Sequence, residues 1–418
     1  MSNFDKNLWR IIIWTLGLST PILASLHPRS FVTGYEVASD SLSHQVLMGG
    51  GYLSFLLLAV LTFTRRSRKN TKQLCVRAFF LLTILMAAMP TISSLVSGGT
   101  LQWALLGAIG LYSATYFLPA PSLEWWVREV RVMLLVVFVY GSLVAAVLFP
   151  HWAWNKGYAI EETSLVVIPW RLFGTANHAN DLAPLAVFAW MLGRFPGCRL
   201  KGEYLHGAAV LLALLLTQSK TMWAVALVLI GVYILIKIAS LGGVRKYLAY
   251  FTLGTGLYAV LYIVKYSRYV SRIEDALSDP AVITLSGRLI LWQYAIETWL
   301  GKPWIGQGLD AWSSKAVLEN VNWAAPHAHN QILQILSQSG LIGMLVVSLW
   351  ALYYFKILRR APAELRIPLW WMSAIFFLPG VTEVVLQFAI GSGGTIAMWI
   401  IFTAVLIVGK SFQLQKGQ

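Results

Sequence analysis

Apolar stretches of roughly 17 to 25 residues recur along the whole chain, and each is long enough to cross about 30 Å of hydrocarbon as a helix. Because a bilayer interior offers no water, the backbone groups of these stretches must pair internally, which makes every span helical. The composition agrees, since 58% of the 418 residues are hydrophobic and only 12% are charged. The sequence therefore predicts an all-α, multi-pass membrane protein and excludes a soluble globular domain.

About twelve transmembrane helices are predicted, within one integral membrane domain that covers residues 1–418. The first stretch contains Pro21 and lacks a small-residue cleavage site, so we expect a retained span and not a signal peptide. The predicted spans are 8–26, 46–64, 78–96, 100–118, 132–149, 181–195, 204–218, 221–239, 248–264, 330–353, 368–389 and 394–409.

Basic turns separate several spans, at 65–69, 199–201, 245–246 and 359–360. With these turns and both termini on one side, that side is strongly basic and the other is close to neutral. The positive-inside rule then places both termini in the cytoplasm and accounts for the net charge of +15 without nucleic-acid binding. The long polar segment 265–329, between the ninth and tenth spans, faces outward, which in a bacterium is the periplasm.

This outer segment contains two predicted amphipathic helices. The first begins at Arg288, repeats apolar residues at helical spacing and ends at 301–303, where a glycine and a proline stop it. The second covers about 311–321. Both are rich in apolar side chains on one face, so we expect them to lie on the membrane lipids over the bundle.

Two cations stand at positions suited to an anion. Arg288 occupies the first turn of its helix, where a positive charge opposes the helix dipole but where free backbone N–H groups favour a bound anion. Lys220 lies in a short polar interruption, 216–222, between two apolar spans. The alternatives are an arginine that contacts lipid phosphate and a lysine that only snorkels to the membrane surface.

Two histidines mark the entrance of the tenth span, in the segment 326–340. His329 stands at the helix N-terminus, where the dipole and partial burial disfavour its charged form, so we expect a neutral imidazole that can act as a base. His327 is expected to point elsewhere. A capping histidine is the alternative reading, and no third ligand at a suitable spacing supports a metal site.

A further polar group precedes the sixth span and consists of Arg171, Asn177, His178 and Asn180. The amide and imidazole groups suit sugar hydroxyls, and the arginine suits a phosphate or a sugar carboxylate. These side chains equally suit a plain helix cap.

Three ionisable residues complete the candidates. Arg268 and Arg272 would extend a basic stripe beyond the ninth span, suited either to an anionic glycolipid or to lipid headgroups. Glu383 follows Pro379 and Gly380 within the eleventh predicted span. A carboxylate at that depth is costly, so we expect a functional or pairing role with Lys220 or an arginine as partner.

The chain lacks a Walker-type phosphate loop and an Asp-x-Asp pair on an outer loop. Because no nucleotide is available outside the inner membrane, a sugar donor there must arrive already activated. A glycan linked through diphosphate to a membrane polyprenol fits, since the diphosphate serves as both leaving group and anchor.

The motifs resemble those of the bacterial O-antigen ligase and polymerase superfamily. The resemblance spans about 170–343 and rests on five segments taken together. They are Leu-Ser-Gly-Arg-Leu-Ile-Leu-Trp at 285–292, Gly-Gln-Gly at 306–308, Ala-His-Asn-Gln-Ile-Leu at 328–333 followed by Gly-Leu-Ile-Gly at 340–343, Arg-Leu-Phe-Gly at 171–174 with Asn180, and Thr-Gln-Ser-Lys at 217–220.

The resemblance implies a GT-C-like glycosyltransferase of the bacterial inner membrane that needs no metal or other cofactor. It would move a glycan from undecaprenyl diphosphate to an acceptor on the periplasmic face, which in the ligase branch is a sugar hydroxyl of lipid A–core. Matched by motif, Arg288 would bind the diphosphate and His329 would act on the acceptor hydroxyl. The family often has arginine where this chain has Lys220, which keeps the charge but loses the two-pronged hydrogen bonding.

Other readings stay open. A polymerase would use a second polyprenyl-linked repeat unit as acceptor, and a protein O-oligosaccharyltransferase would use a serine or threonine. A glycolipid transporter would carry ionisable groups near the bilayer midplane on several helices, whereas here they gather mostly at the outer boundary. Because no carboxylate nucleophile is evident, we expect a single displacement that inverts the anomeric centre.

Overall fold

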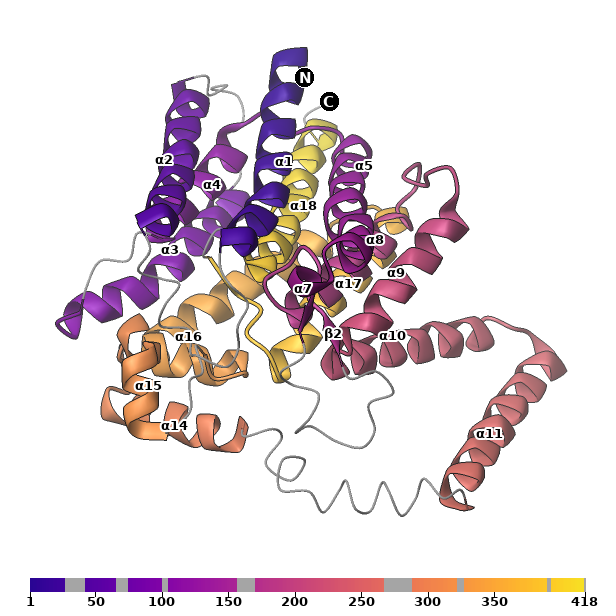
Figure 1. Cartoon of the computed structure of the whole chain (residues 1–418). Coiled ribbons are helices and arrows are strands. Elements are labelled where there is room, and N and C mark those ends of the chain that lie inside the picture. Colours follow the sequence, from indigo (N-terminus) through magenta and orange to yellow (C-terminus); the bar gives the residue numbers. More distant parts are fainter. Residues whose placement is uncertain are drawn as a thin grey trace.

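The computed structural model describes residues 1–26, 42–64, 74–99, 104–155, 170–266, 288–321, 327–388 and 392–416. Within these ranges the backbone is mostly helical (Figure 1). The one strand pairing in them is the antiparallel ribbon of β1 (Trp154–Asn155) and β2 (Arg171–Leu172). The prediction of an all-α membrane protein agrees with this part of the chain. Arg268 and Arg272 lie outside the described residues.

The helices of the first half are α1 (Asn3–Leu26), α2 (Leu42–Thr64), α3 (Leu74–Val96), α4 (Ala104–Phe117), α5 (Leu123–Met133), the π-helix η2 (Leu134–Tyr140), α6 (Gly141–Leu148), α7 (Pro150–Ala153), α8 (Ala179–Leu192) and α9 (Glu203–Thr217). Those of the second half are α10 (Lys220–Ala239), α11 (Gly243–Tyr266), α14 (Arg288–Gly301), the 3-10 helix η3 (Leu309–Trp312), α15 (Ser314–Val321), α16 (Gln331–Leu358), α17 (Ala363–Phe377), the 3-10 helix η4 (Leu378–Val381) and α18 (Gly393–Lys416).

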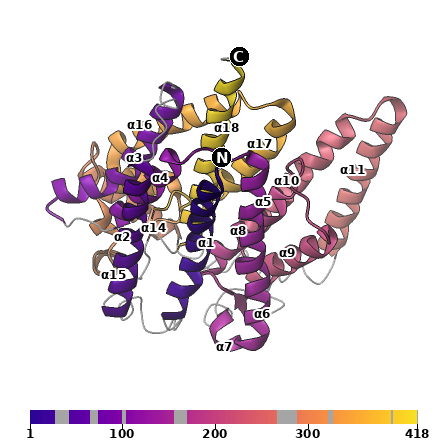
Figure 2. The ribbon, with the colours of Figure 1, turned by 90° about the horizontal axis from the view of Figure 1, so that it is seen from above.

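Among the described residues, five helices are long and apolar enough to cross a membrane: α3, the continuous rod Leu123–Leu148, α10, α16 and Gly393–Ser411 of α18. Shorter apolar helices lie within α2, α4, α8 and α9. The chain is therefore a multi-pass membrane protein. The total of twelve spans, the single domain, the outward placement of 265–329 and the GT-C-like arrangement stay predictions. Both termini lie at one end of the bundle, and their cytoplasmic location also stays a prediction (Figures 1 and 2).

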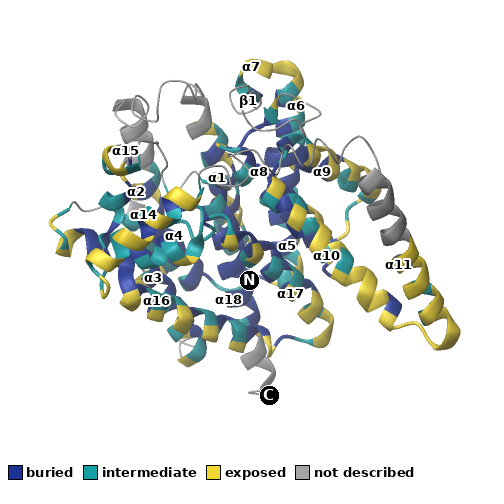
Figure 3. Cartoon of the chain, turned by 90° about the horizontal axis from the view of Figure 1, so that it is seen from below, coloured by how far each residue is buried: buried dark blue, intermediate teal, exposed yellow. Residues whose placement is uncertain are grey.

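The core surrounds α18, whose span is 89% buried inside the protein, whereas that of α10 is 17% buried. Phe79 of α3 stacks between Trp350 of α16 and Phe402 of α18, with ring centroids 5.6 and 5.4 Å away. Such interlocked aromatic rings fix how these three helices pack. The apolar surface of α10 is largely exposed, and Figure 3 shows α10 and α11 at the edge of the bundle. Exposed apolar side chains of this kind are expected where a helix faces lipid.

A break in α16 fixes α14 across the end of the bundle. Gly340 has a φ of 59°, and its Cα lies so close to the backbone of Trp304 that any Cβ would collide. The loop after α14 bonds to the chain on both sides of this break, from Gln307 N to Ser337 O (2.8 Å) and from Leu341 N to Pro303 O (2.9 Å). The glycine-containing motifs at 306–308 and 340–343 therefore have a structural role, which is to seat α14 on α16.

The predicted eleventh span, 368–389, is wrong at its C-terminal end. α17 ends at Phe377, η4 covers Leu378–Val381, and residues 382–388 are non-helical. Pro379 and Gly380 disfavour a continuous helix here because proline lacks an N–H and glycine is conformationally permissive. Glu383 consequently lies on an irregular segment between α17 and α18, and not inside a transmembrane helix.

Arg131 of α5 joins three segments through a buried guanidinium. It donates to Ala189 O (3.0 Å), to Cys198 O (2.9 Å) and to both carboxylate oxygens of Glu203 (2.8 Å each), and it is fully buried. Removing one member of a buried ion pair typically costs about 3–5 kcal/mol because the other charge is left without its partner. The partial exposure of Glu203, 20% of its side chain, places the expected cost near the lower limit.

We therefore expect Arg131→Ala to lower the free energy of unfolding by about 3 kcal/mol. The thermal unfolding midpoint of the purified protein in detergent measures this loss. Arg128→Ala is the matched control, because Arg128 is an exposed arginine of the same helix and should change stability by less than about 0.5 kcal/mol. Equal midpoints for the two variants would contradict the structural role of Arg131.

Candidate active site

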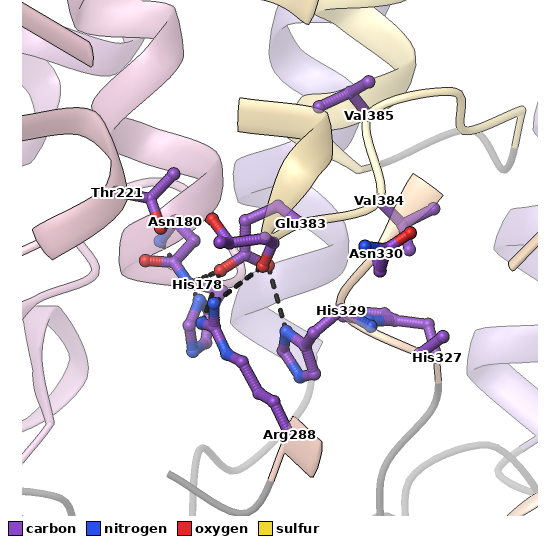
Figure 4. A network of polar contacts seen from close by, with 12 residues as sticks. His178, Asn180, Thr221, Arg288, His327, His329, Asn330, Glu383, Val384 and Val385 are labelled. Atoms are coloured by element: carbon purple, nitrogen blue, oxygen red, sulfur yellow. Dashed lines mark hydrogen bonds and ion pairs between the residues drawn. The ribbon is translucent and has the colours of Figure 1, made fainter. Parts of the chain in front are cut away.

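The carboxylate of Glu383 joins three segments that are distant in sequence (Figure 4). Its Oε1 accepts hydrogen bonds from Arg288 Nη2 and Asn180 Nδ2, both at 2.8 Å, and its Oε2 lies 3.0 Å from His329 Nδ1. The Glu383 side chain is 13% exposed. Burial alone would raise the pKa of this carboxyl, but the hydrogen bond from His329 and the charge of Arg288 outweigh that effect and lower the pKa to about 2. Glu383 is therefore ionised at neutral pH.

Arg288 is the first residue of α14, as predicted, and its guanidinium is held by the segment between α17 and α18. Nη1 donates to Thr382 O at 2.7 Å, and Nη2 forms the ion pair with Glu383. The prediction that Glu383 pairs with an arginine or with Lys220 is confirmed, and the partner is Arg288. The ion pair fixes the direction of a side chain that would otherwise sample many rotamers.

His329 immediately precedes the N-cap of α16. Asn330 is the cap, since its Oδ1 accepts from Ile332 N (3.0 Å) and Leu333 N (3.1 Å), while its Nδ2 donates to Val381 O (3.0 Å). His329 itself has a φ of 48°, a left-handed conformation that is rare without glycine. This backbone turn directs the imidazole toward Glu383 and away from the helix end.

The surroundings of His329 differ from those expected at a helix N-terminus. The helix amides bond to Asn330, and the group that faces His329 Nδ1 is the Glu383 carboxylate. A carboxylate at this nitrogen favours the tautomer with the proton on Nδ1, which leaves the lone pair of Nε2 free to accept a proton. The contact with Glu383 therefore orients the imidazole of His329, and the role of His329 as a base stays a prediction.

The prediction that His327 points elsewhere is wrong. Its ring meets that of His329 edge to face with centroids 4.2 Å apart, and its Nδ1 accepts a hydrogen bond from His329 N (3.3 Å). Burial and, to a smaller extent, the nearby His329 lower the pKa of His327 to about 3. The pKa of His178 is also about 3, because the side chain is buried and lies near the charge of Arg171. These two imidazoles are thus neutral at pH 7.

The segment 171–180 reaches the same carboxylate through Asn180. Asn180 Oδ1 accepts from Arg171 Nη2 (3.2 Å) and Ser219 Oγ (3.0 Å), and Arg171 Nε donates to Thr217 O (3.1 Å). His178 is the N-cap of α8, with its Nδ1 accepting from Asn180 N (3.0 Å). Asn177 lies exposed in the same turn. One residue of this segment therefore caps the helix and others contact the residues around Glu383, while binding of a sugar or a phosphate by the segment stays a prediction.

Lys220 is exposed at the start of α10, and its neighbours anchor it to the site. Ser219 bonds to Asn180, and Thr221 Oγ1 lies 2.9 Å from Thr382 Oγ1.

Gln218, which precedes Ser219, has a φ of 50°. Gln218 and His329 are the non-glycine residues of positive φ in the described part of the chain. Arg171, Lys220 and Arg288 thus bring positive charge from three segments to one end of the bundle, where an anionic group would be attracted.

Sequence reasoning missed several residues of the site, among them Thr382 and Gln331. Thr382 accepts from Arg288 through its backbone oxygen, and Gln331 Oε1 accepts from Val385 N (2.8 Å) and Leu386 N (2.7 Å). Gln331 therefore ties the irregular segment around Glu383 to the start of α16. The one available signal was the Pro-Gly pair at 379–380, which marks where the chain leaves the helix and exposes backbone groups that need partners.

The fold and this cluster define a multi-pass α-helical membrane protein with a half-buried site of ionisable side chains. A family model described as O-antigen ligase matches residues 207–348, which include Lys220, Arg288 and His329 but not Glu383. No curated protein matches the chain. This match supports membership of the O-antigen ligase superfamily, as the motifs predicted, and a glycosyltransferase-like role in O-antigen processing with lipid-linked glycan and lipid acceptor substrates in general.

Proposed function

We propose that this protein is an O-antigen ligase of the bacterial inner membrane, which transfers the polysaccharide from undecaprenyl diphosphate to a sugar hydroxyl of lipid A–core at the periplasmic face. The observation that carries the proposal is the sharing of one largely buried carboxylate by Arg288 and His329. The carboxylate of Glu383 would hold Arg288, the cation that binds the donor diphosphate, and His329, the base that acts on the acceptor hydroxyl, in fixed positions. Pre-organisation of this kind contributes to catalysis because the groups need not reorganise during the reaction.

In the proposed reaction the acceptor oxygen attacks the anomeric carbon of the donor glycan. His329 Nε2 takes the proton of the acceptor hydroxyl as the new glycosidic bond forms, and Nδ1–H stays bonded to Glu383. The bond between the anomeric carbon and the diphosphate oxygen breaks, and its electron pair leaves with undecaprenyl diphosphate. Arg288, Lys220 and Arg171 offset the charge that grows on this leaving group. A single displacement inverts the anomeric centre and requires no metal.

The test is a reconstituted reaction. The purified protein is incubated with polyprenyl-diphosphate glycan and rough lipopolysaccharide in the presence of EDTA and without nucleotide, and products are separated by gel electrophoresis. We expect lipopolysaccharide that carries the polysaccharide. Elongated polyprenyl glycan without modified lipopolysaccharide would replace the ligase by the polymerase, and glycan on a serine or threonine would indicate the protein O-oligosaccharyltransferase. Movement of the lipid-linked glycan across vesicles without any joined product would indicate the transporter.

A further inference from the structure

A cavity lies along α14, with a volume of about 420 Å³, where this helix meets the C-terminal end of α3 and η3. None of its lining residues belongs to the cluster around Glu383. The polar side chains that line it are those of Ser97, Tyr294, Thr298, Gln307 and Asp310, and no lysine or arginine is among the described residues of its wall. The cavity is therefore unsuited to a phosphate and suited to a neutral polar ligand.

Two of the lining residues, Ser97 and Asp310, each carry a side-chain oxygen (Oγ and Oδ2, respectively) that is buried and has no hydrogen-bond partner among the described residues. The carboxylate oxygen lies against Gly99, where any Cβ would collide with it. A carboxylate accepts hydrogen bonds and donates none, and buried polar atoms without partners are rare in native proteins. A ligand in the cavity that donates hydrogen bonds, as hydroxyl groups do, would supply the partner that the side chains of these two lining residues lack.

The walls of the cavity are held in place from both sides. Tyr294 donates through its hydroxyl to Ala311 O (2.7 Å), and its ring packs edge to face against Trp312 at 5.4 Å. Leu309 N donates to Ser94 Oγ (2.8 Å), which ties η3 to α3. A ligand entering this cavity would meet a preformed wall, so little binding energy would be lost in ordering it.

The cavity lies within reach of a glycan bound at the active site. Tyr294 and Thr298 follow Arg288 on the same helix by six and ten positions, about 9 and 15 Å along the helix axis. We propose that the cavity is a subsite for a neutral pyranose unit of the glycan substrate, whose adjacent hydroxyls donate to Asp310 and Ser97. The nature of the ligand rests on the proposed function, and the glycan is either the donor polysaccharide or the acceptor core oligosaccharide.

The experiment measures binding without transfer. Lipid-free oligosaccharides from the O-polysaccharide and from the lipopolysaccharide core are titrated separately into the full-length protein in detergent, by calorimetry or saturation-transfer NMR. We expect one of the two to bind, which identifies the source of the sugar. Asp310→Asn and Ser97→Ala should each weaken that binding, the first by about tenfold or more because it removes a charged acceptor. Asp5→Asn, at the N-terminus, is the matched control and should leave binding unchanged.

The outcomes separate this subsite from the proposed function. If Asp310→Asn does not fold, the binding titration is carried out with Ser97→Ala, which removes only one hydroxyl group at the end of a helix. Binding that both substitutions leave intact, or no binding of either glycan to the wild-type protein, would overturn the subsite without touching the transfer reaction. Binding that depends on Asp310 in a protein that joins glycan to no acceptor would keep the subsite and overturn the proposed function.

Discussion

Replacing Glu383 by glutamine is expected to lower the turnover number of glycan transfer by about 10²–10⁴-fold, the range in which general base catalysis contributes. The substituted side chain has the same size, so packing is retained. Its amide, however, cannot bond as before to Arg288, Asn180 and His329 at once, because all three present N–H donors and the amide nitrogen is itself a donor.

The largest effect of Glu383→Gln is expected on the tautomer of the His329 imidazole. An amide NH₂ facing Nδ1 favours the tautomer that carries its proton on Nε2, and this removes the lone pair that would accept the acceptor's proton. In the serine-protease triad, the corresponding change of a carboxylate to an amide costs about 10⁴-fold in turnover for the same reason. The loss should therefore appear in kcat for transfer while the donor still binds through Lys220 and Arg171.

Two measurements keep the outcome interpretable. Turnover is measured in the reconstituted transfer reaction, and the thermal unfolding midpoint shows whether the variant folds. Glu129→Gln is the matched control, because it breaks an exposed ion pair with Arg10 (2.9 Å) that touches no site residue, and exposed pairs contribute about 0–1 kcal/mol. Near-normal turnover of a folded Glu383→Gln variant would contradict the role of the carboxylate in orienting His329.

Replacing His329 by alanine is expected to reduce transfer by a similar factor, about 10²–10⁴-fold, because it removes the proposed base. His327→Ala provides the comparison within the same loop. His327 accepts a backbone N–H from His329, so its removal loosens the loop but leaves the base and its carboxylate in place. We expect a much smaller loss of transfer activity, because His327→Ala disturbs the orientation of His329 but leaves the proposed base in place.

The two variants are compared in the same assay, with wild-type protein and with matched amounts of folded protein. An inactive His327→Ala variant beside a nearly normal His329→Ala variant would show that the wrong histidine was chosen. Loss of the unfolding transition in His329→Ala would indicate a structural role, although Asn330, which caps α16, is unchanged in that variant.

Much of the local structure was predictable because its signals are local. The start of α14 at Arg288, its end at Gly301 and the start of α16 beside His329 follow from periodicity, from glycine and proline, and from a capping asparagine. The second amphipathic helix was expected over 311–321 and appears as η3 and α15. The superfamily was likewise readable from short motifs, and the family match over 207–348 confirms it.

The candidate site was only partly predictable, since Arg288, His329, Asn180 and Glu383 were each identified without their geometry. The placement of Glu383 inside a helix was wrong, and the expected effect of the helix dipole on His329 stays a prediction. A hydropathy profile averages over a window of many residues. It therefore does not reveal that η4 ends at Val381 and that the chain then turns toward Arg288.

The sequence by itself determined the class of protein and several of the residues that stand at the ends of its apolar helices, because hydrophobic length and helix capping act between neighbours in the chain. Only the tertiary structure shows that the carboxylate of Glu383 joins Arg288, His329 and Asn180. Glu383 lies 54 positions after His329 and 95 after Arg288, and 203 after Asn180. Contacts at such separations arise from how helices pack, which no local pattern of residues encodes.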